Sequence, residues 1–189
     1  MIAIFASDMN YTRLNTTEHP LFEQAWELYK KSFPPEERRQ LRTQRKIMNH
    51  PQYRFDVITD NNHLTGILLW WRFDELRFIE HIATSPCIRG KGYGRQILQQ
   101  FIEETATTPV VLEVERPTTE INKRRIAFYQ RLGFVYNDYP YQQPPYKKGG
   151  SFIPMALMTC PDAITKNEVN LFCEKYHPVI YKFAFGLDF

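Results

Sequence analysis

The sequence predicts a single α/β domain built on a mixed, mostly antiparallel sheet with helices on both faces. Two observations carry this prediction. Three strand-like segments in the first half are separated only by short polar turns, which is typical of an antiparallel meander. Helical and strand-like segments then alternate, and this order lays helices across a sheet. A chain of 189 residues that is 43% hydrophobic and 15% aromatic has enough apolar material for one core.

The N-terminal part predicts a strand or arm followed by two helices. Residues 1–13 have a short apolar stretch that no basic segment precedes, so we do not expect a signal peptide. From His19 to Phe33 the apolar residues fall on one side of a helix, which Pro34 and Pro35 end. A second helical stretch continues to about Asn49. It is polar and rich in arginine, and we expect it to be solvated.

Apolar runs bounded by glycine, proline and polar residues predict the remaining elements. The meander strands are expected over Tyr53 to Thr59, His63 to Phe73 and Leu76 to Thr84. We then expect a helix over Arg95 to Thr105, a buried strand over Val110 to Val114, a helix over Asn122 to Leu132, and strands over Phe134 to Tyr136 and Phe152 to Met158, with a loop over residues 139–150. Gly133 suits the left-handed residue that ends a helix.

The end of the chain predicts an appendage to the domain. We expect the domain to span residues 1–160 and a C-terminal extension to span residues 161–189. The extension contains one helical segment and an aromatic end. We expect it to pack on the domain or on a partner subunit, which leaves homodimer formation open.

Composition argues against several functional classes. The formal net charge of +3 is too small to indicate nucleic-acid binding by itself. Cys87, Cys160 and Cys173 lack metal-binding spacing, so we expect reduced thiols, no metal and a cytoplasmic protein. The most apolar run, Gly66 to Trp71, is far shorter than the ~20 residues of a membrane-spanning helix.

A glycine-rich segment lies where a strand passes into a helix. Its residues are Arg89, Gly90, Lys91, Gly92, Tyr93, Gly94 and Arg95. Glycines let backbone N–H groups converge at a helix N-terminus, which favours an anion, and the basic side chains add positive charge. The spacing matches neither the Walker loop nor the dinucleotide fingerprint. The segment is a candidate pyrophosphate cradle, and the alternative is a glycine-rich turn with solvated basic side chains.

Two blocks of the sequence resemble the GNAT acetyltransferase superfamily. The stretch IEHIATSPCIRGKGYGRQILQQFI resembles its acetyl-CoA-binding motif, with Arg89, Gly92 and Gly94 at the signature positions. The stretch LEVERPTTEINKRRIAFYQRLGF resembles its second conserved block, and the matching positions there are Asn122, Tyr129, Gly133 and Phe134. The resemblance extends roughly from Tyr11 to Thr159 and looks like an uncharacterised bacterial subgroup.

This resemblance implies a sheet with a V-shaped splay between the fourth and fifth strands, near Ile82–Thr84 and Leu112–Val114. Separated strands leave backbone groups unpaired, and in the family the pantetheine arm of acetyl-CoA pairs with them. The resemblance therefore implies that Ile82, Ala83 and Thr84 contact the arm. It also implies that the segment from Arg89 to Arg95 holds the pyrophosphate and that Asn122 approaches the arm from the other side.

The implied reaction needs a base, because a lysine-type amine with a pKa of about 10 must lose a proton before it attacks a thioester. Glu80 and Glu113 are the candidates, and Glu113 resembles the general-base position of bacterial enzymes that acetylate ribosomal-protein N-termini. Strand alternation places Glu113 and Glu115 on one face. It places His81 opposite Glu80, so that only one of these two faces the cleft. The alternative is that the glutamates pair with arginines, namely Arg72, Arg77, Arg116 or Arg124.

Tyr129 is the candidate acid, because many family members use a tyrosine at this place to protonate the departing thiolate, and a neutral phenol can donate a proton. The alternative is a core aromatic. Four further aromatic residues fall on segments that would border an acceptor cleft, where they would suit a cation: Trp70, Trp71, Tyr141 and Tyr146. The more usual role of such residues is packing.

The sequence leaves three alternative functions to compare. The first is an acyltransferase that transfers acetyl from acetyl-CoA to a primary amine of a small molecule or peptide, by direct attack in a ternary complex. The second is an acyl-CoA-binding sensor or partner domain without turnover. The third is nucleic-acid binding through the arginine-rich stretch, Arg38, Arg39, Arg42, Arg45 and Lys46. The low net charge argues against the third, and we expect neither nucleic-acid nor membrane partners.

Overall fold

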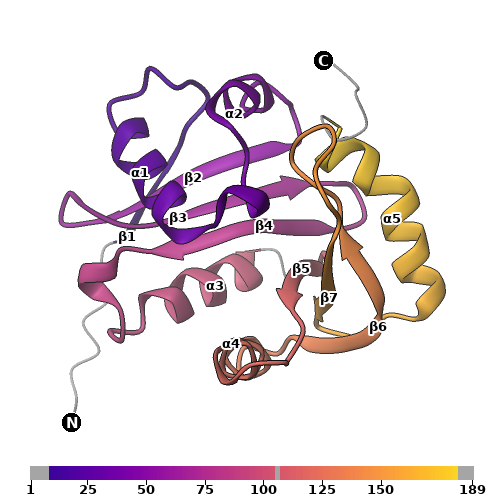
Figure 1. Ribbon diagram of the computed structural model, residues 1–189. Coiled ribbons are helices and arrows are strands. Elements are labelled where there is room, and N and C mark those ends of the chain that lie inside the picture. Colours follow the sequence, from indigo (N-terminus) through magenta and orange to yellow (C-terminus); the bar gives the residue numbers. More distant parts are fainter. Residues whose placement is uncertain (1–8, 105–106, 183–189) are drawn as a thin grey trace, which may run out of the picture.

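The structure, a computed structural model, describes residues 9–104 and 107–182. Seven strands form one sheet in the order β1-β2-β3-β4-β5-β7-β6, in which β4 and β5 are parallel and the other neighbours antiparallel (Figure 1). The strands are β1 (Met9–Arg13), β2 (Tyr53–Asp60), β3 (His63–Arg72), β4 (Arg77–Thr84), β5 (Val110–Glu115), β6 (Val135–Gln143) and β7 (Ile153–Cys160). The predicted mixed, mostly antiparallel sheet is confirmed. The predicted N-terminal arm lies outside the described residues up to residue 8.

Helices cover both faces of the sheet (Figure 1). One face packs against α1 (Phe22–Ser32), α2 (Leu41–Ile47) and α5 (Lys166–Ile180), and the other packs against α3 (Tyr93–Glu104) and α4 (Glu120–Gln130). Two short 3₁₀ turns, η1 (Pro35–Glu37) and η2 (Pro86–Ile88), follow α1 and β4. Gly133 has φ +90° just after α4, as predicted. Within the described ranges, no helix has the length and apolar character needed to cross a bilayer.

The C-terminal helix α5 belongs to the same core as the central strands. Thr165 begins it with a capping box, in which the Thr165 and Glu168 side chains each bind the other residue's backbone N–H. Its buried residues, Val169, Phe172, Tyr176 and Ile180, join the cluster formed by α1 and one face of the sheet. The helix therefore packs on its own domain. The predicted aromatic end of the chain, residues 183–189, lies outside the described residues.

The sheet opens between β4 and β5. These strands pair only over Arg77–Ile79 and Val110–Leu112. Beyond that point β4 continues along β3 to Thr84, and β5 continues along β7 to Glu115. Each strand therefore keeps one paired edge and leaves the other without a strand partner, as the resemblance implied.

A β-bulge in β4 overturns one prediction about the two faces of this strand. Leu69 of β3 lies opposite His81. The next residue of β3, Trp70, lies opposite Ile79 rather than Glu80. Glu80 is therefore the extra residue of the bulge, and its side chain points to the same face as that of His81. The expectation that only one of the two faces the cleft was wrong, because simple alternation does not survive a bulge.

Strand β6 is longer than predicted. It continues to Gln143, through residues that the proline and tyrosine content assigned to a loop. The pairing with β7 shifts register between Asn137 and Tyr141, around Pro140. Proline is tolerated there because β6 is the last strand of the sheet and the register is irregular. The extension of β6 brings Tyr141 and Gln143 beside the opening between β4 and β5.

Candidate active site

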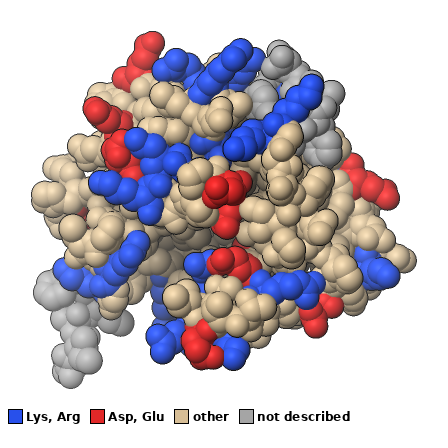
Figure 2. All heavy atoms as spheres, viewed as in Figure 1, with Lys and Arg blue, Asp and Glu red and all other residues tan. Residues whose placement is uncertain are grey.

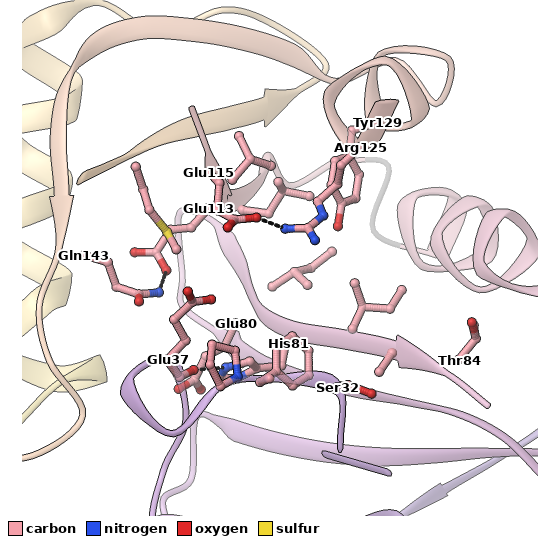
Figure 3. Close-up of a pocket in the computed structure, with 18 of the residues that line it drawn as sticks. Ser32, Glu37, Glu80, His81, Thr84, Glu113, Glu115, Arg125, Tyr129 and Gln143 are labelled. Atoms are coloured by element: carbon pink, nitrogen blue, oxygen red, sulfur yellow. Dashed lines mark hydrogen bonds and ion pairs between the residues drawn. The ribbon is translucent and has the colours of Figure 1, made fainter. Parts of the chain in front are cut away.

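A cleft of about 350 Å³ lies where β4 and β5 separate (Figure 3). Three groups of predicted site residues line it, namely Ile82, Ala83 and Thr84 on β4, Glu80 and Glu113 on β4 and β5, and Arg89 and Tyr129 from the segments that follow these strands. Several lining residues were not predicted, among them Ser32, Glu37, Arg125, Gln143 and Met155. The cleft thus combines an open strand edge with both acidic and basic side chains.

The glycine-rich segment lies at one end of this cleft. Gly90 and Gly92 have φ of +80° and +84°, a conformation that other residues adopt only with strain. Helix α3 begins directly afterwards, so its first N–H groups are available to an anion. A Cβ on Gly94 would lie 3.7 Å from the Cγ2 atom of Thr84, which places the helix start beside the end of β4. The residues present fit a pyrophosphate whose attached arm lies along β4.

Two predicted cofactor residues are engaged elsewhere. The Tyr93 hydroxyl donates to Asp60 Oδ2 at 2.5 Å, and this bond ties the start of α3 to β2. Asn122 is buried, and its Nδ2 donates to the carbonyl oxygen of Arg116 at 3.1 Å. Asn122 is not among the described residues that line the cleft. Both side chains therefore hold the loops around the cleft.

Glu80 forms a buried ion pair with Arg39. Arg39 Nη2 lies 2.6 Å from Glu80 Oε1, and both side chains are at most 1% exposed. Trp71 Nε1 donates to the second carboxylate oxygen at 2.9 Å. The Arg39 guanidinium also lies over the ring of Tyr146, 5.0 Å from its centroid. Glu80 is thus fully buried and its charge is paired with a cation, which is the environment of a structural carboxylate.

The burial of Arg39 corrects the prediction for one residue of the arginine-rich stretch, whereas Arg42 and Arg45 are exposed as expected. This stretch was expected to be solvated, yet Arg39 is 1% exposed between η1 and α2. Its Nη2 also donates to the carbonyl oxygen of Ile180 at 2.8 Å. The arginine partners predicted for the glutamates were likewise wrong for Glu80. The partner comes from a loop that folds back over β4, and strand neighbours alone cannot reveal it.

Glu113 has a different environment, made of neutral donors. The hydroxyl of Tyr141 donates to Oε1, and Gln143 Nε2 donates to Oε2 at 2.6 Å. The hydroxyl of Tyr181 lies 2.8 Å from Oε1 and 2.7 Å from Oε2. Burial raises the pKa of Glu113 to about 7, although the hydrogen bonds oppose this shift. A carboxylate with this pKa can both accept and release a proton near neutral pH.

Tyr129 and an ion pair form the wall opposite Glu80 (Figure 3). Tyr129 packs against Phe128 and Phe134 and is 8% exposed, and burial raises its pKa, which keeps the phenol neutral. Arg125 Nη1 on the same helix binds Glu115 Oε2. Tyr129 is therefore both a core aromatic residue and part of the cleft lining, so the two alternatives from the sequence do not exclude each other.

His81 and Glu37 close the lower side of the cleft (Figure 3). His81 Nε2 donates to the carbonyl oxygen of Glu37 at 2.8 Å, and burial lowers the pKa of His81 to about 4. The imidazole ring packs edge-on against Tyr29 and Phe33. Burial together with Glu115 raises the pKa of Glu37. His81 is therefore a neutral packing residue, whereas Glu37 adds an acidic side chain to the lining of the cleft.

The four aromatic residues predicted near an acceptor do not form its lining. Trp70 lies on the opposite face of the sheet, 5.0 Å from Phe101, and donates to Asp56. Trp71 and Tyr146 are buried beside Arg39. Tyr141 reaches the site only through its hydroxyl on Glu113. Packing is the role of all four rings.

The comparisons with known proteins agree with this fold and cleft. The model of the acetyltransferase (GNAT) family matches residues 19–134. A solved structure assigned to the GNAT acetyltransferases, from Bacteroides thetaiotaomicron, is 37% identical. It has a TM-score of 0.84, with 91% of this chain and 98% of that chain covered. The fold and cleft are thus those of an acyltransferase. The chain belongs to the GNAT family.

More distant solved structures share the fold. The ribosomal-protein-S18-alanine N-acetyltransferase of Escherichia coli is 19% identical, with a TM-score of 0.57 over 84% of this chain and 97% of that chain. A GNAT acetyltransferase of Elizabethkingia anophelis with acetyl-CoA bound is 17% identical, with a TM-score of 0.53 over 80% and 96%. No match is found among curated proteins.

Proposed function

We propose that the protein is an N-acetyltransferase that transfers the acetyl group of acetyl-CoA to a primary amine, by direct attack in a ternary complex. The observation that carries this proposal is the position of Glu113. It is a partly buried carboxylate with a pKa of about 7 inside the cleft at which β4 and β5 separate. Membership of the GNAT family supports acetyl transfer in general. The choice of a primary amine as acceptor and the assignment of the proton transfers go beyond family membership and are what we propose.

Acetyl-CoA supplies a thioester whose carbonyl carbon the amine attacks, so that a C–N bond forms, the C–S bond breaks and CoA leaves as its thiol. Ile82, Ala83 and Thr84 would hold the pantetheine arm, and the segment from Arg89 to Arg95 would hold the pyrophosphate. Glu113 takes the proton that the ammonium group loses before attack, and the second proton leaves the nitrogen to solvent once the C–N bond has formed. Tyr129 donates a proton to the departing sulfur and regains one from solvent, since a buried neutral phenol is a suitable donor.

The acceptor proposed is a cationic amine on a small molecule or a peptide. Arg39 neutralises Glu80, and Arg125 binds Glu115, so Glu37 and Glu113 are the acidic groups of the cleft that remain for a cation. Acidic side chains also lie at the hollow in the middle of this face, with basic side chains around it (Figure 2). We place the enzyme in the cytoplasm, which suits its three free cysteines.

The first test is binding of acetyl-CoA to the purified protein by calorimetry. We expect the wild type to bind and Gly92→Arg to lose binding, because the new side chain would fill the cradle and strain a φ of +84°. Gly149→Arg is the matched control, because Gly149 has φ +76° and open space around it, but lies in the β6–β7 loop. Equal loss in both variants, or no binding by the wild type, would contradict the proposed cofactor.

Replacement of Tyr129 with Phe should lower kcat by at least about 10²-fold while the acetyl-CoA affinity stays near that of the wild type. The hydroxyl is the only group removed, and the ring contacts with Phe128 and Phe134 remain. The measurement is a free-thiol assay with a panel of primary amines. A variant as fast as the wild type would exclude Tyr129 as the acid.

The sensor without turnover remains the competing function. It is favoured if Tyr129 and the glutamates point away from the cleft. Tyr129, Glu80, Glu113 and Glu115 all line the cleft, which argues for turnover. The amine panel decides between the two, because a sensor binds acetyl-CoA yet releases no thiol with any amine. Homodimer formation stays a prediction that sedimentation can test.

A further inference from the structure

The side chains that bind the Glu113 carboxylate come from outside the segment that matches the family. The family match ends at residue 134, and the three donors follow it. Tyr141 and Gln143 lie on β6, and Tyr181 follows α5. Tyr181 is the one whose hydroxyl lies within 2.8 Å of both carboxylate oxygens. The C-terminal part of the chain therefore builds the surroundings of this glutamate.

The position of Tyr181 is itself held from several sides. The residue is 0% exposed, and its ring packs against Tyr146 and His177 with centroid distances of 5.1 and 5.5 Å. Its backbone N–H donates to the carbonyl oxygen of His177 at 2.8 Å. The preceding carbonyl, that of Ile180, accepts from Arg39 Nη2 at 2.8 Å. The end of α5 is thus tied to the buried ion pair on β4, and the ring of Tyr181 is held between its neighbours.

We propose that Tyr181 is a positioning residue, whose hydroxyl holds the Glu113 carboxylate in the orientation that takes a proton from the acceptor amine. This inference rests on the proposed role of Glu113 as the base. The C-terminal helix then has a function in addition to packing, because it carries the residue that orients the base. Tyr141 and Gln143 each bind one of the two oxygens, whereas the Tyr181 hydroxyl lies within hydrogen-bond distance of both, so it acts on the carboxylate as a whole.

The charges around Glu113 set the direction of the expected effect. Glu80 on β4 acts on it from one side and is paired with Arg39. The titratable groups facing it from β6, the β6–β7 loop and α5 are neutral at pH 7: Tyr141, Tyr146, Cys173, Tyr181 and, through Tyr141, His177. A hydroxyl that donates to a carboxylate stabilises its charged form. Removal of the Tyr181 hydroxyl therefore raises the pKa of Glu113.

The test replaces Tyr181 with Phe and uses Tyr176→Phe as the matched control. Tyr176 lies on α5, five residues before Tyr181, and its hydroxyl also binds a carboxylate, that of Glu75 at 2.8 Å. We expect Tyr181→Phe to move the acid limb of the pH profile of kcat/KM upward by about 1 pH unit, because the base must be ionised. Acetyl-CoA affinity should not change. Tyr176→Phe should leave the profile where it is in the wild type.

A second measurement separates this inference from the proposed function. The ¹³C-labelled side-chain carboxyl of Glu113, assigned by its absence in Glu113→Gln, is titrated by NMR without any acceptor. Its midpoint should rise in Tyr181→Phe even if no amine is found that reacts. If Tyr181→Phe does not fold, 3,5-difluorotyrosine at position 181 is a stronger donor and should lower the midpoint instead. An unchanged midpoint and acid limb would overturn the inference, whereas turnover without any effect of Glu113→Gln would overturn only the proposed base.

Discussion

Replacement of Glu113 with Gln should lower kcat/KM for acetyl transfer by about 10²–10⁴-fold near neutral pH and leave acetyl-CoA binding intact. Gln keeps the shape of the side chain and can still accept hydrogen bonds from Tyr141 and Tyr181, but it takes up no proton. The wild-type rate should fall below pH 7, because the pKa of Glu113 is about 7. That acid limb should be missing in the variant.

The pH dependence gives this prediction a second criterion. The difference between wild type and Glu113→Gln should narrow as the pH approaches the pKa of the amine, about 10 for a lysine-type amine, because the amine then loses its proton unaided. Glu115→Gln is the control on the same strand, where the carboxylate is bound to Arg125, and it should lose much less activity. Equal losses in both variants at every pH would show that Glu113 is not the base.

Replacement of Arg39 with Met should lower the free energy of unfolding by about 3–5 kcal/mol, because it leaves the buried Glu80 carboxylate without its cation. The variant also loses the bond from Nη2 to the carbonyl oxygen of Ile180, which anchors the end of α5. Urea unfolding at pH 7, followed by tryptophan fluorescence, measures the change. We expect the folded fraction of Arg39→Met to keep the wild-type fold, since the remaining core contacts are apolar.

Two further variants show whether the loss comes from the unpaired charge. Combining Arg39→Met with Glu80→Gln removes the buried charge while keeping an acceptor for Trp71 Nε1, so part of the stability should return. Lys123→Met breaks an exposed pair with Glu120 and should change stability by no more than about 0.5 kcal/mol. A loss in Arg39→Met no larger than that of Lys123→Met would refute the structural role of the pair.

Local sequence determined the elements that depend on backbone conformation and periodicity. The glycine-rich segment before α3 was recognisable because positive φ values at Gly90 and Gly92 require glycine, and Gly133 ends α4 for the same reason. The spacing of apolar residues identified the three strands of the meander and the helices α3 and α4. The order of two linked motifs indicated the GNAT family before any coordinates, and the family match confirms it.

Longer-range pairing escaped sequence reasoning wherever a residue's partner lies far along the chain. The bulge at Glu80 depends on the register between β3 and β4, which no local pattern encodes. Arg39 looked like a member of a solvated arginine-rich stretch, but a side chain 41 residues away on β4 makes it part of the core. Pro140 of β6, with the two prolines that follow the strand, suggested a loop, because only the edge position of β6 makes a proline acceptable there.

The sequence alone thus determined the family and the mixed sheet, and it indicated a candidate cradle and three candidate catalytic side chains, since each rests on residue types at short spacing. Only the tertiary structure showed how the surroundings of the two glutamates differ, and this difference supports the proposal of Glu113 as the base. Both Glu80 and Glu113 line the cleft, but Arg39 pairs with the first, whereas neutral hydroxyls and an amide surround the second. The physical reason is that the pKa and the availability of a carboxylate depend on desolvation and on the partners that folding brings to it. These partners are distant in the sequence, since Arg39 is 41 residues from Glu80 and Tyr181 is 68 residues from Glu113.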